Sequence, residues 1–161
     1  MTLNPFKLIA RRKTLREVES KVPTGLVPLS EIKTVTVYIE RNSYDWSATE
    51  RKVRRFFENK DIQVETIIMN SLDVDWLGRR RRSLTKKSIE GHEDLLISLL
   101  PVNSFALKYC AISSNAKFKI GREQIRKNVF DLVVSDRTTD SDDGSQIAVF
   151  DYITELFTKL Q

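Results

Sequence analysis

The segment Asp94-Leu-Leu-Ile-Ser-Leu-Leu-Pro101 constrains the fold more than any other part of this sequence. Its apolar run has the length of a strand rather than of a helix, and Pro101 closes it. A strand that is apolar on both faces has to be covered on both sides, as a central strand of a parallel sheet is. The segment therefore predicts an α/β fold, with helices on the faces of a largely parallel sheet.

A strand–helix–strand unit precedes this segment. Residues 35–39, Val-Thr-Val-Tyr-Ile, are β-branched or aromatic throughout, as strands prefer. Ser47 and Glu50 have the spacing of a capping box, which predicts a helix that begins at Ser47 and ends near Asn59. A second strand is predicted over residues 62–69. The short turns at both ends of the helix indicate a right-handed parallel crossover.

The alternation of strands and helices continues after residue 101. The pattern predicts a helix from Ser104 to about Ser114 and strands over residues 116–120 and 130–134. After an acidic turn at residues 140–144, apolar residues at spacings of three and four predict a final helix: Ile147, Phe150, Ile153, Phe157 and Leu160.

The predicted fold class is therefore α/β, a three-layer Rossmann-like sandwich with a mostly parallel sheet of about five strands. The expected strand order is 2-1-3-4-5. An order of 3-2-1-4-5, with an additional strand within residues 70–90, is the alternative.

Residues 1–28 are expected to stand apart from this unit. A basic helix is predicted from about Pro5 to Lys21, and residues 22–28 hold two prolines and a glycine, as linkers do. The expected organisation is thus a basic N-terminal helix and linker over residues 1–28 and a single α/β domain over residues 29–161. A chain of 161 residues is near the most common size of one domain.

Several classes of protein are disfavoured by the composition. Arg11, Arg12 and Lys13 interrupt the N-terminal apolar stretch that a signal peptide needs, and no apolar run is long enough to form a membrane helix. The single cysteine, Cys110, cannot form an intrachain disulfide and is expected to be a small buried apolar residue. A cytoplasmic protein without a transmembrane segment is expected.

No catalytic residue, metal site or cofactor is expected from the motifs. His92 is the only histidine, and neither a Gly-x-Gly-x-x-Gly nor a Walker loop is present. The acidic residues Asp140, Asp142 and Asp143 lack the remaining spacing of a calcium loop, so helix capping is the better interpretation.

Candidate ligand-binding residues follow from the predicted topology alone. Parallel sheets bind ligands beyond the carboxyl ends of their strands, where the strand order reverses. Five polar residues follow the predicted strands and would meet at this edge: Ser43, Asp45, Asn103, Arg122 and Asp136. Ordinary turn and capping roles are the alternative, because the same residue types dominate turns.

Four consecutive arginines are the most unusual feature of the sequence: Arg79, Arg80, Arg81 and Arg82. Residues 1–90 hold 19 Lys and Arg against 12 Asp and Glu, whereas residues 91–161 hold 8 against 10. Clustered arginines bind phosphate groups, so the run is a candidate site for nucleic acid or another polyanion. A solvated basic loop is the alternative interpretation.

Three segments carry a family resemblance: Asp75-Trp-Leu-Gly78, residues 94–101 and residues 107–121. Over most of its length the chain resembles a family of small uncharacterised Bacteroidetes proteins, which implies no activity. Residues 94–121 are also distantly similar to the N-terminal, acceptor half of heptosyltransferase-type glycosyltransferases. The sequence departs from that type, because Arg41-Asn-Ser-Tyr-Asp45 stands where those enzymes have a glycine-rich loop and a second, nucleotide-sugar-binding domain is not expected.

Three hypotheses on function follow. The preferred one is a non-enzymatic binding or assembly domain with an unidentified partner, either another protein or a second copy of the chain. The alternative is a small-ligand or glycosyltransferase-like enzyme that uses the crevice at the strand ends. The third hypothesis is nucleic-acid or polyanion binding through Arg79–Arg82.

Overall fold

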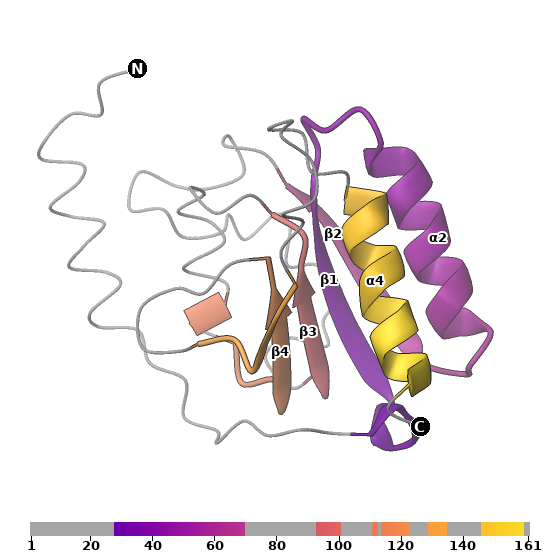
Figure 1. The fold of residues 1–161 in the computed structure, drawn as a ribbon, viewed down its shortest axis with the longest axis vertical. Coiled ribbons are helices and arrows are strands. Elements are labelled where there is room, and N and C mark those ends of the chain that lie inside the picture. Colours follow the sequence, from indigo (N-terminus) through magenta and orange to yellow (C-terminus); the bar gives the residue numbers. More distant parts are fainter. Residues whose placement is uncertain are drawn as a thin grey trace, which may run out of the picture.

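The computed structural model describes residues 28–69, 93–100, 111–112, 114–122, 129–134 and 146–159. Their centre is a five-stranded, all-parallel sheet in the order β2-β1-β3-β4-β5 (Figure 1). The strands are β1 (Thr34–Glu40), β2 (Gln63–Met69), β3 (Leu95–Ser98), β4 (Phe118–Gly121) and β5 (Leu132–Val133). The predicted α/β class is therefore confirmed, and the described strands have the expected order 2-1-3-4-5. The alternative order depends on an additional strand within residues 70–90, which lie outside the described residues.

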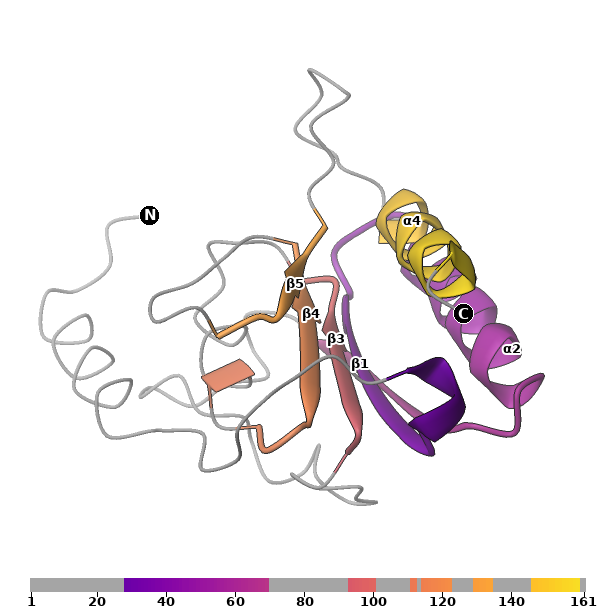
Figure 2. The ribbon, with the colours of Figure 1, turned by 60° about the horizontal axis from the view of Figure 1, so that its bottom comes forward.

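Two helices cover one face of this sheet. They are α2 (Trp46–Glu58), which connects β1 to β2, and α4 (Gln146–Lys159), and they lie side by side in both ribbon views (Figures 1 and 2). Beneath them the rings of Phe56, Phe57 and Phe150 pack edge to face or tilted, with centroids 5.0–6.1 Å apart. A 3-10 turn, η1 (Leu29–Glu31), leads into β1.

The second face of the sheet is also buried. A separate apolar cluster covers it, built from Tyr38, Ile67, Met69, Leu96, Leu100, Ala111, Ala116 and Phe130. All four residues of β3 are buried, which explains why its sequence is apolar on both faces. Of the helix expected from Ser104 to about Ser114, the structure describes Ala111 and Ile112, which are helical, and Ser114, which is not.

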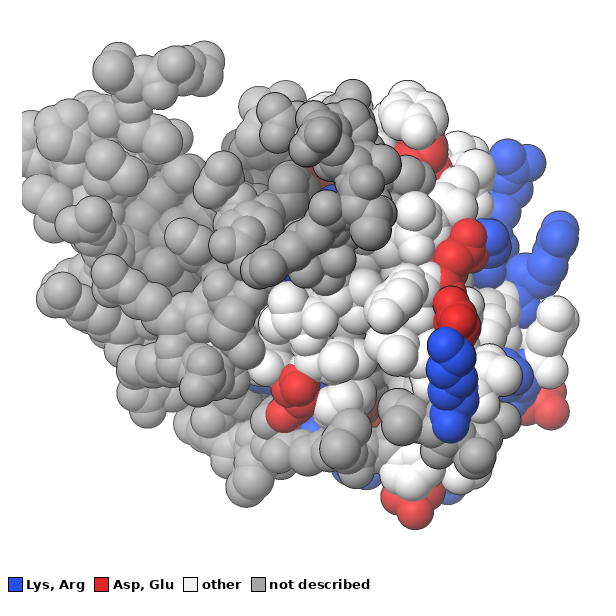
Figure 3. Space-filling model, viewed as in Figure 1, with Lys and Arg blue, Asp and Glu red and all other residues white. Residues whose placement is uncertain are grey.

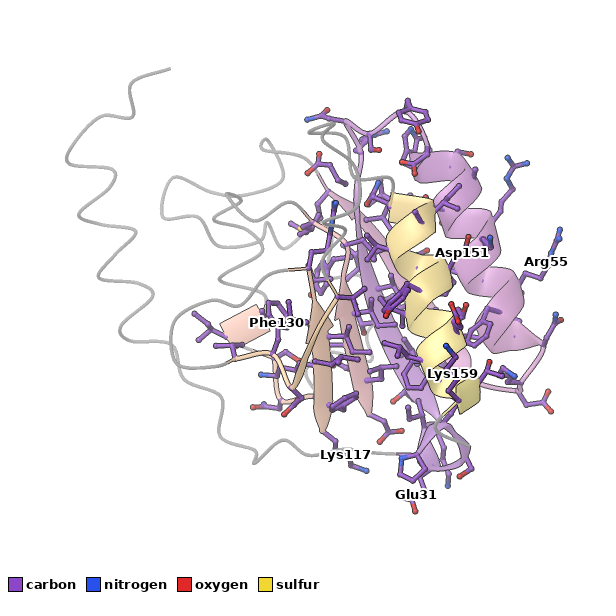
Figure 4. All side chains as sticks on the ribbon, viewed as in Figure 1. Glu31, Arg55, Lys117, Phe130, Asp151 and Lys159 are labelled. Carbon is purple, nitrogen blue, oxygen red and sulfur yellow. The ribbon has the colours of Figure 1, made fainter. Side chains whose placement is uncertain are left out.

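Asp94 ties the amino ends of β1, β3 and β4 together. Its Oδ2 accepts hydrogen bonds from the backbone N–H of Lys33 and Thr34 at 2.9 and 3.2 Å, and Oδ1 lies 2.9 Å from the Lys117 ammonium. Figure 4 shows Lys117 at this end of the sheet. Burial alone would raise the pKa of Asp94, but the bonds from Lys117, Lys33 and Thr34 outweigh it and lower the pKa.

The start of α2 differs from the prediction. The helix begins at Trp46 with Asp45 at the N-cap position, so Ser47 is already inside the first turn and the capping-box interpretation is wrong. The Asp45 side chain does not cap its own helix, because it is bonded elsewhere, as described below. The helix ends at Glu58, close to the predicted residue 59.

Strand β4 lies where a strand was predicted over residues 116–120, although it begins at Phe118. Lys117 is exposed, but Lys119 is only 1% exposed, because β4 lies between two other strands and both of its faces are covered.

Other expectations fall outside the described residues. These are the basic helix at residues 5–21, the linker that follows it, residues 70–92 and the acidic turn at 140–144. The division of the chain at residue 28 therefore stays a prediction. Among the described residues, no helix has the length and apolar character that crossing a membrane requires.

Candidate functional site

The carboxyl ends of β1 and β3 form the edge where the strand order reverses, which is the place where a ligand was expected. Ser43 and Asp45 lie here, in the connection between β1 and α2. The Ser43 hydroxyl donates a hydrogen bond to Asp45 Oδ1, so these two predicted residues do come together. Asp45 is 5% exposed, so the protein groups that contact its carboxylate determine whether a ligand could reach it.

The Asp45 carboxylate binds the start of α4. Its Oδ2 accepts a hydrogen bond from the backbone N–H of Ile147 at 3.2 Å, and its Oδ1 lies 3.5 Å from the Gln146 side-chain nitrogen. A carboxylate in this position satisfies a free amide of the first helical turn and also interacts favourably with the helix dipole. Asp45 is thus an anchor between the β1–α2 connection and α4.

Gln146 extends the hydrogen-bonding ladder of the sheet. Glu40 directs its backbone groups toward β3, but β3 ends too early to pair with them. The Gln146 side-chain amide takes that place. Its oxygen accepts from Glu40 N–H at 2.8 Å, and its nitrogen donates to Glu40 C=O at 3.1 Å. Gln146 is 1% exposed and was not expected at this edge, since nothing in the local sequence distinguishes it.

Arg122 follows β4, two strands away from Asp45. Its Nη1 donates to the Leu99 carbonyl at 3.3 Å, which links the ends of β3 and β4. Beside it in the sheet, the Ser98 hydroxyl is buried and has no hydrogen-bond partner among the described residues. The remaining predicted site residues lie outside the described part of the chain: Asn103, Asp136, Arg79, Arg80, Arg81 and Arg82.

A buried charged cluster lies on the second face of the sheet and was not predicted. The Lys119 ammonium donates a hydrogen bond to the Ala111 carbonyl at 2.9 Å. Glu93, 4% exposed, accepts a hydrogen bond from the Ser114 hydroxyl at 2.8 Å. Burial lowers the pKa of Lys119, and the negative charges of Asp131 and Glu93 offset part of that effect.

This cluster fits a structural role. Ala111 is helical, and the Lys119 ammonium is the hydrogen-bond donor to its carbonyl. A buried lysine with a lowered pKa can also mark a reactive amine. Reaction with a substrate needs access to the nitrogen, however, and the side chain is almost completely enclosed.

The outer surface of α2 is basic. Figure 3 shows blue side chains gathered at the side of the molecule where α2 lies. Arg51 and Arg55 are exposed one turn apart, and Figure 4 shows Arg55 directed away from the helix pair. Lys52 forms an ion pair with Asp151 of α4. Arg54 is half-buried, with its Nη2 donating to Thr66 Oγ1 at 2.7 Å.

The fold defines this chain as an α/β protein whose strand-end carboxylate holds a helix in place. Over residues 7–156 it matches, and therefore belongs to, a family of unknown function, DUF6913. No curated protein and no solved structure matches the chain. The expected membership of a family without an assigned activity is thus confirmed, while the Bacteroidetes origin and the similarity to heptosyltransferases stay predictions.

Proposed function

We propose that this chain is a non-enzymatic binding or assembly domain. The observation that supports it is that the Asp45 carboxylate is bonded within the protein. Asp45 is the one predicted carboxylate at the strand ends that the structure describes. A carboxylate that binds substrate or transfers protons has to be open to a ligand. Both oxygens of Asp45 instead face hydrogen-bond donors of the protein, and the side chain is 5% exposed.

The enzyme hypothesis would use the same edge. A small-ligand or glycosyltransferase-like reaction would need polar groups that converge on a substrate there. Arg122 is engaged by the Leu99 carbonyl and Ser43 by Asp45, so the described candidates contribute to the fold. A ligand site would then depend on Asn103 and Asp136.

Thermal unfolding in the presence of ligands tests this proposal. The panel contains nucleotides, sugar nucleotides, inorganic phosphate and Mg²⁺, each added to the full chain. A ligand present at about 100 times its Kd stabilises a protein by about 2.7 kcal/mol, which such a scan detects. We expect no ligand of the panel to change the Tm.

The matched variants are Ser43→Ala and Asp45→Asn. Both are expected to lower the Tm without any ligand, because they weaken the anchor of α4. A ligand that raises the Tm of the original chain but not that of Ser43→Ala would place a binding site at this edge and contradict the proposal.

Polyanion binding through Arg79–Arg82 is the second candidate, and the uneven charge of the chain favours it. The basic excess lies entirely within residues 1–90, which include this run. Each phosphate contact releases counterions, so affinity would fall steeply as salt rises. Removing about four contacts should reduce the slope of log K against log salt by about 3 for a single-stranded nucleic acid.

The test replaces Arg79, Arg80, Arg81 and Arg82 by Gln and measures retention of RNA and DNA across salt concentrations. The control removes the same charge from four exposed residues of the described surface: Arg41, Arg51, Arg55 and Lys60. Loss of retention in the first variant alone supports this candidate. Equal retention in both variants removes it.

A further inference from the structure

We propose that two copies of this chain associate through β2, antiparallel and about a twofold axis, so that their sheets join into one. The inference rests on the proposed function as an assembly domain and names its partner and its surface. Among the strands that the structure describes, β2 lies at the edge of the sheet, with β1 as its neighbour on one side. The hydrogen-bonding register of β1 and β2 determines which backbone groups of β2 point to its other side.

The β1–β2 ladder determines which backbone groups of β2 face outward. Gln63 N–H donates to the Lys33 carbonyl at 2.9 Å, and the Met69 carbonyl accepts from Arg41 N–H at 2.8 Å. In a parallel pair, alternate residues of one strand make all the bonds to its neighbour. The residues with odd numbers from 63 to 69 therefore bond to β1, and the backbone groups of Val64, Thr66 and Ile68 point away from the sheet.

Residues 63–69, the described part of this edge, carry neither a proline nor a bulge that would block strand addition. Proteins protect their edges with proline, bulges or charged residues at the outward positions. β2 pairs with β1 in an unbroken register over its seven residues, and its sequence, Gln-Val-Glu-Thr-Ile-Ile-Met, contains no proline or glycine. Within the described residues, no hydrogen bond reaches the outward backbone groups of Val64, Thr66 or Ile68.

The edge is complementary to itself. If the twofold axis passes beside Thr66, then Thr66 of one copy faces Thr66 of the other, and Val64 faces Ile68. In an antiparallel pair, facing residues of this kind exchange both of their backbone hydrogen bonds. One register thus pairs the outward amides and carbonyls of both strands. An isologous contact of this type closes as a dimer and does not extend further.

The side chains fit the same register. Val64 and Ile68 are half-buried against the core beneath α2, and their remaining apolar surface would be covered by Ile68 and Val64 of the second copy. On the other face Glu65 would lie opposite Ile67, so the register places no like charges opposite each other.

The charges next to the axis are also complementary. The Thr66 hydroxyl donates to Glu50 Oε1 at 2.9 Å and accepts from Arg54 Nη2 at 2.7 Å. Glu50 and Arg54 also form an ion pair with each other, with 3.3 Å between Arg54 Nε and Glu50 Oε1. Because both residues lie beside the axis, each copy brings one positive and one negative group to the contact. Arg54 of one copy would then face Glu50 of the other, as interface charges do when they determine register.

The main test compares two substitutions at one residue by sedimentation velocity over a range of protein concentrations. Thr66→Pro removes the outward N–H, which β1 does not use, and Thr66→Ala removes the same hydroxyl but keeps the N–H. We expect the original chain and Thr66→Ala to dimerise at high micromolar concentration and Thr66→Pro to stay monomeric. A monomeric original chain, or a Thr66→Pro variant that dimerises as well as Thr66→Ala, would overturn the proposal.

A second measurement checks the register and does not depend on how Thr66→Pro folds. In a chain that also carries Cys110→Ser, Thr66→Cys places two thiols opposite each other, whereas Gln63→Cys places them about 20 Å apart along the ladder. Mild oxidation should give a covalent dimer of the first variant and little of the second. Equal yields would contradict this register.

These outcomes separate the two proposals. A monomeric chain that fails to respond to the ligand panel removes the β2 contact but leaves a binding domain with another partner. A ligand-dependent rise in Tm that is lost in Ser43→Ala removes the proposed function, whatever the oligomeric state.

Discussion

Gln146 pairs with both backbone groups of Glu40, although 106 residues separate them in the sequence. The side-chain amide has a donor and an acceptor in the arrangement of a peptide group, and it replaces the strand residue that β3 does not provide. Few side chains can do this, because the position needs an oxygen and an N–H at the same time.

Gln146→Ala should therefore lower the free energy of unfolding by about 1–3 kcal/mol, the usual cost of leaving buried polar groups without partners. Urea unfolding monitored by circular dichroism would measure it. Thr158→Ala is the matched control, since Thr158 is exposed on α4 and its hydroxyl donates only within the helix. Equal stability of the two variants would refute a role for Gln146 in the sheet.

The lowered pKa of Asp94 predicts a loss of stability in acid. The folded state favours the charged carboxylate, so this contribution is present above the pKa of the unfolded chain, near 3.8, and is lost as the pH falls through the lower folded-state pKa. Asp94→Asn should be less stable than the original chain at neutral pH, with a difference that shrinks in acid. Urea unfolding midpoints at several pH values test this, with the exposed Glu58→Gln as control. If the difference in stability between the original chain and Asp94→Asn did not change with pH, the charged Asp94 carboxylate would not be its cause.

Gly121 lies against the ring of Phe130. A Cβ at residue 121 would come within 2.5–2.6 Å of three ring carbons, closer than any side chain tolerates. Gly121→Ala should destabilise the protein by about 1–3 kcal/mol through overpacking. Phe130→Leu in the same chain should recover part of that loss, because it removes the atoms that collide. If the double variant is no more stable than Gly121→Ala, the ring contact is not the cause.

Lys119 is buried, and the negative charges of Asp131 and of the buried Glu93 act on its ammonium. Lys119→Met removes the donor to the Ala111 carbonyl together with this positive charge, so it should lower the free energy of unfolding by about 1–3 kcal/mol. Adding Glu93→Gln removes the stranded carboxylate, and the double variant should be more stable than Lys119→Met alone. A double-mutant cycle measures this coupling; strict additivity would mean that the two groups act independently.

The strands and the sheet order were predictable because their signals are local. Residues 35–39 are β-branched or aromatic, as strands prefer, and residues 95–97 are apolar on both faces, as a covered parallel strand requires. The lengths of the connections also suit crossovers. The burial of Lys119 did not follow from the alternating sequence of β4, because alternation indicates an exposed face only when one side of the sheet is open. Here the strand has a neighbour on each side and a cover on each face, so Lys119 is buried.

The candidate site was predictable only in part. Ser43 and Asp45 stand in one turn, and their proximity follows from the sequence alone. The role of Asp45 depends on α4, whose first residues contact it from 101 and 102 positions away. Local patterns carry no information on such a pairing. The same contact explains why the Asp45 side chain does not cap α2 from the N-cap position, because its carboxylate is bonded to α4.

The anchoring of α4 also bears on how the chain is synthesised. The ribosome synthesises β1 before α4. The backbone N–H and C=O of Glu40, the last residue of β1, therefore lack their hydrogen-bond partner until residue 146 has emerged. Until then, the apolar face that α4 covers stays accessible, and a nascent chain in this state is prone to aggregate or to bind chaperones. The hydrogen bonds at this end of β1 are consequently completed only after α4 has been synthesised.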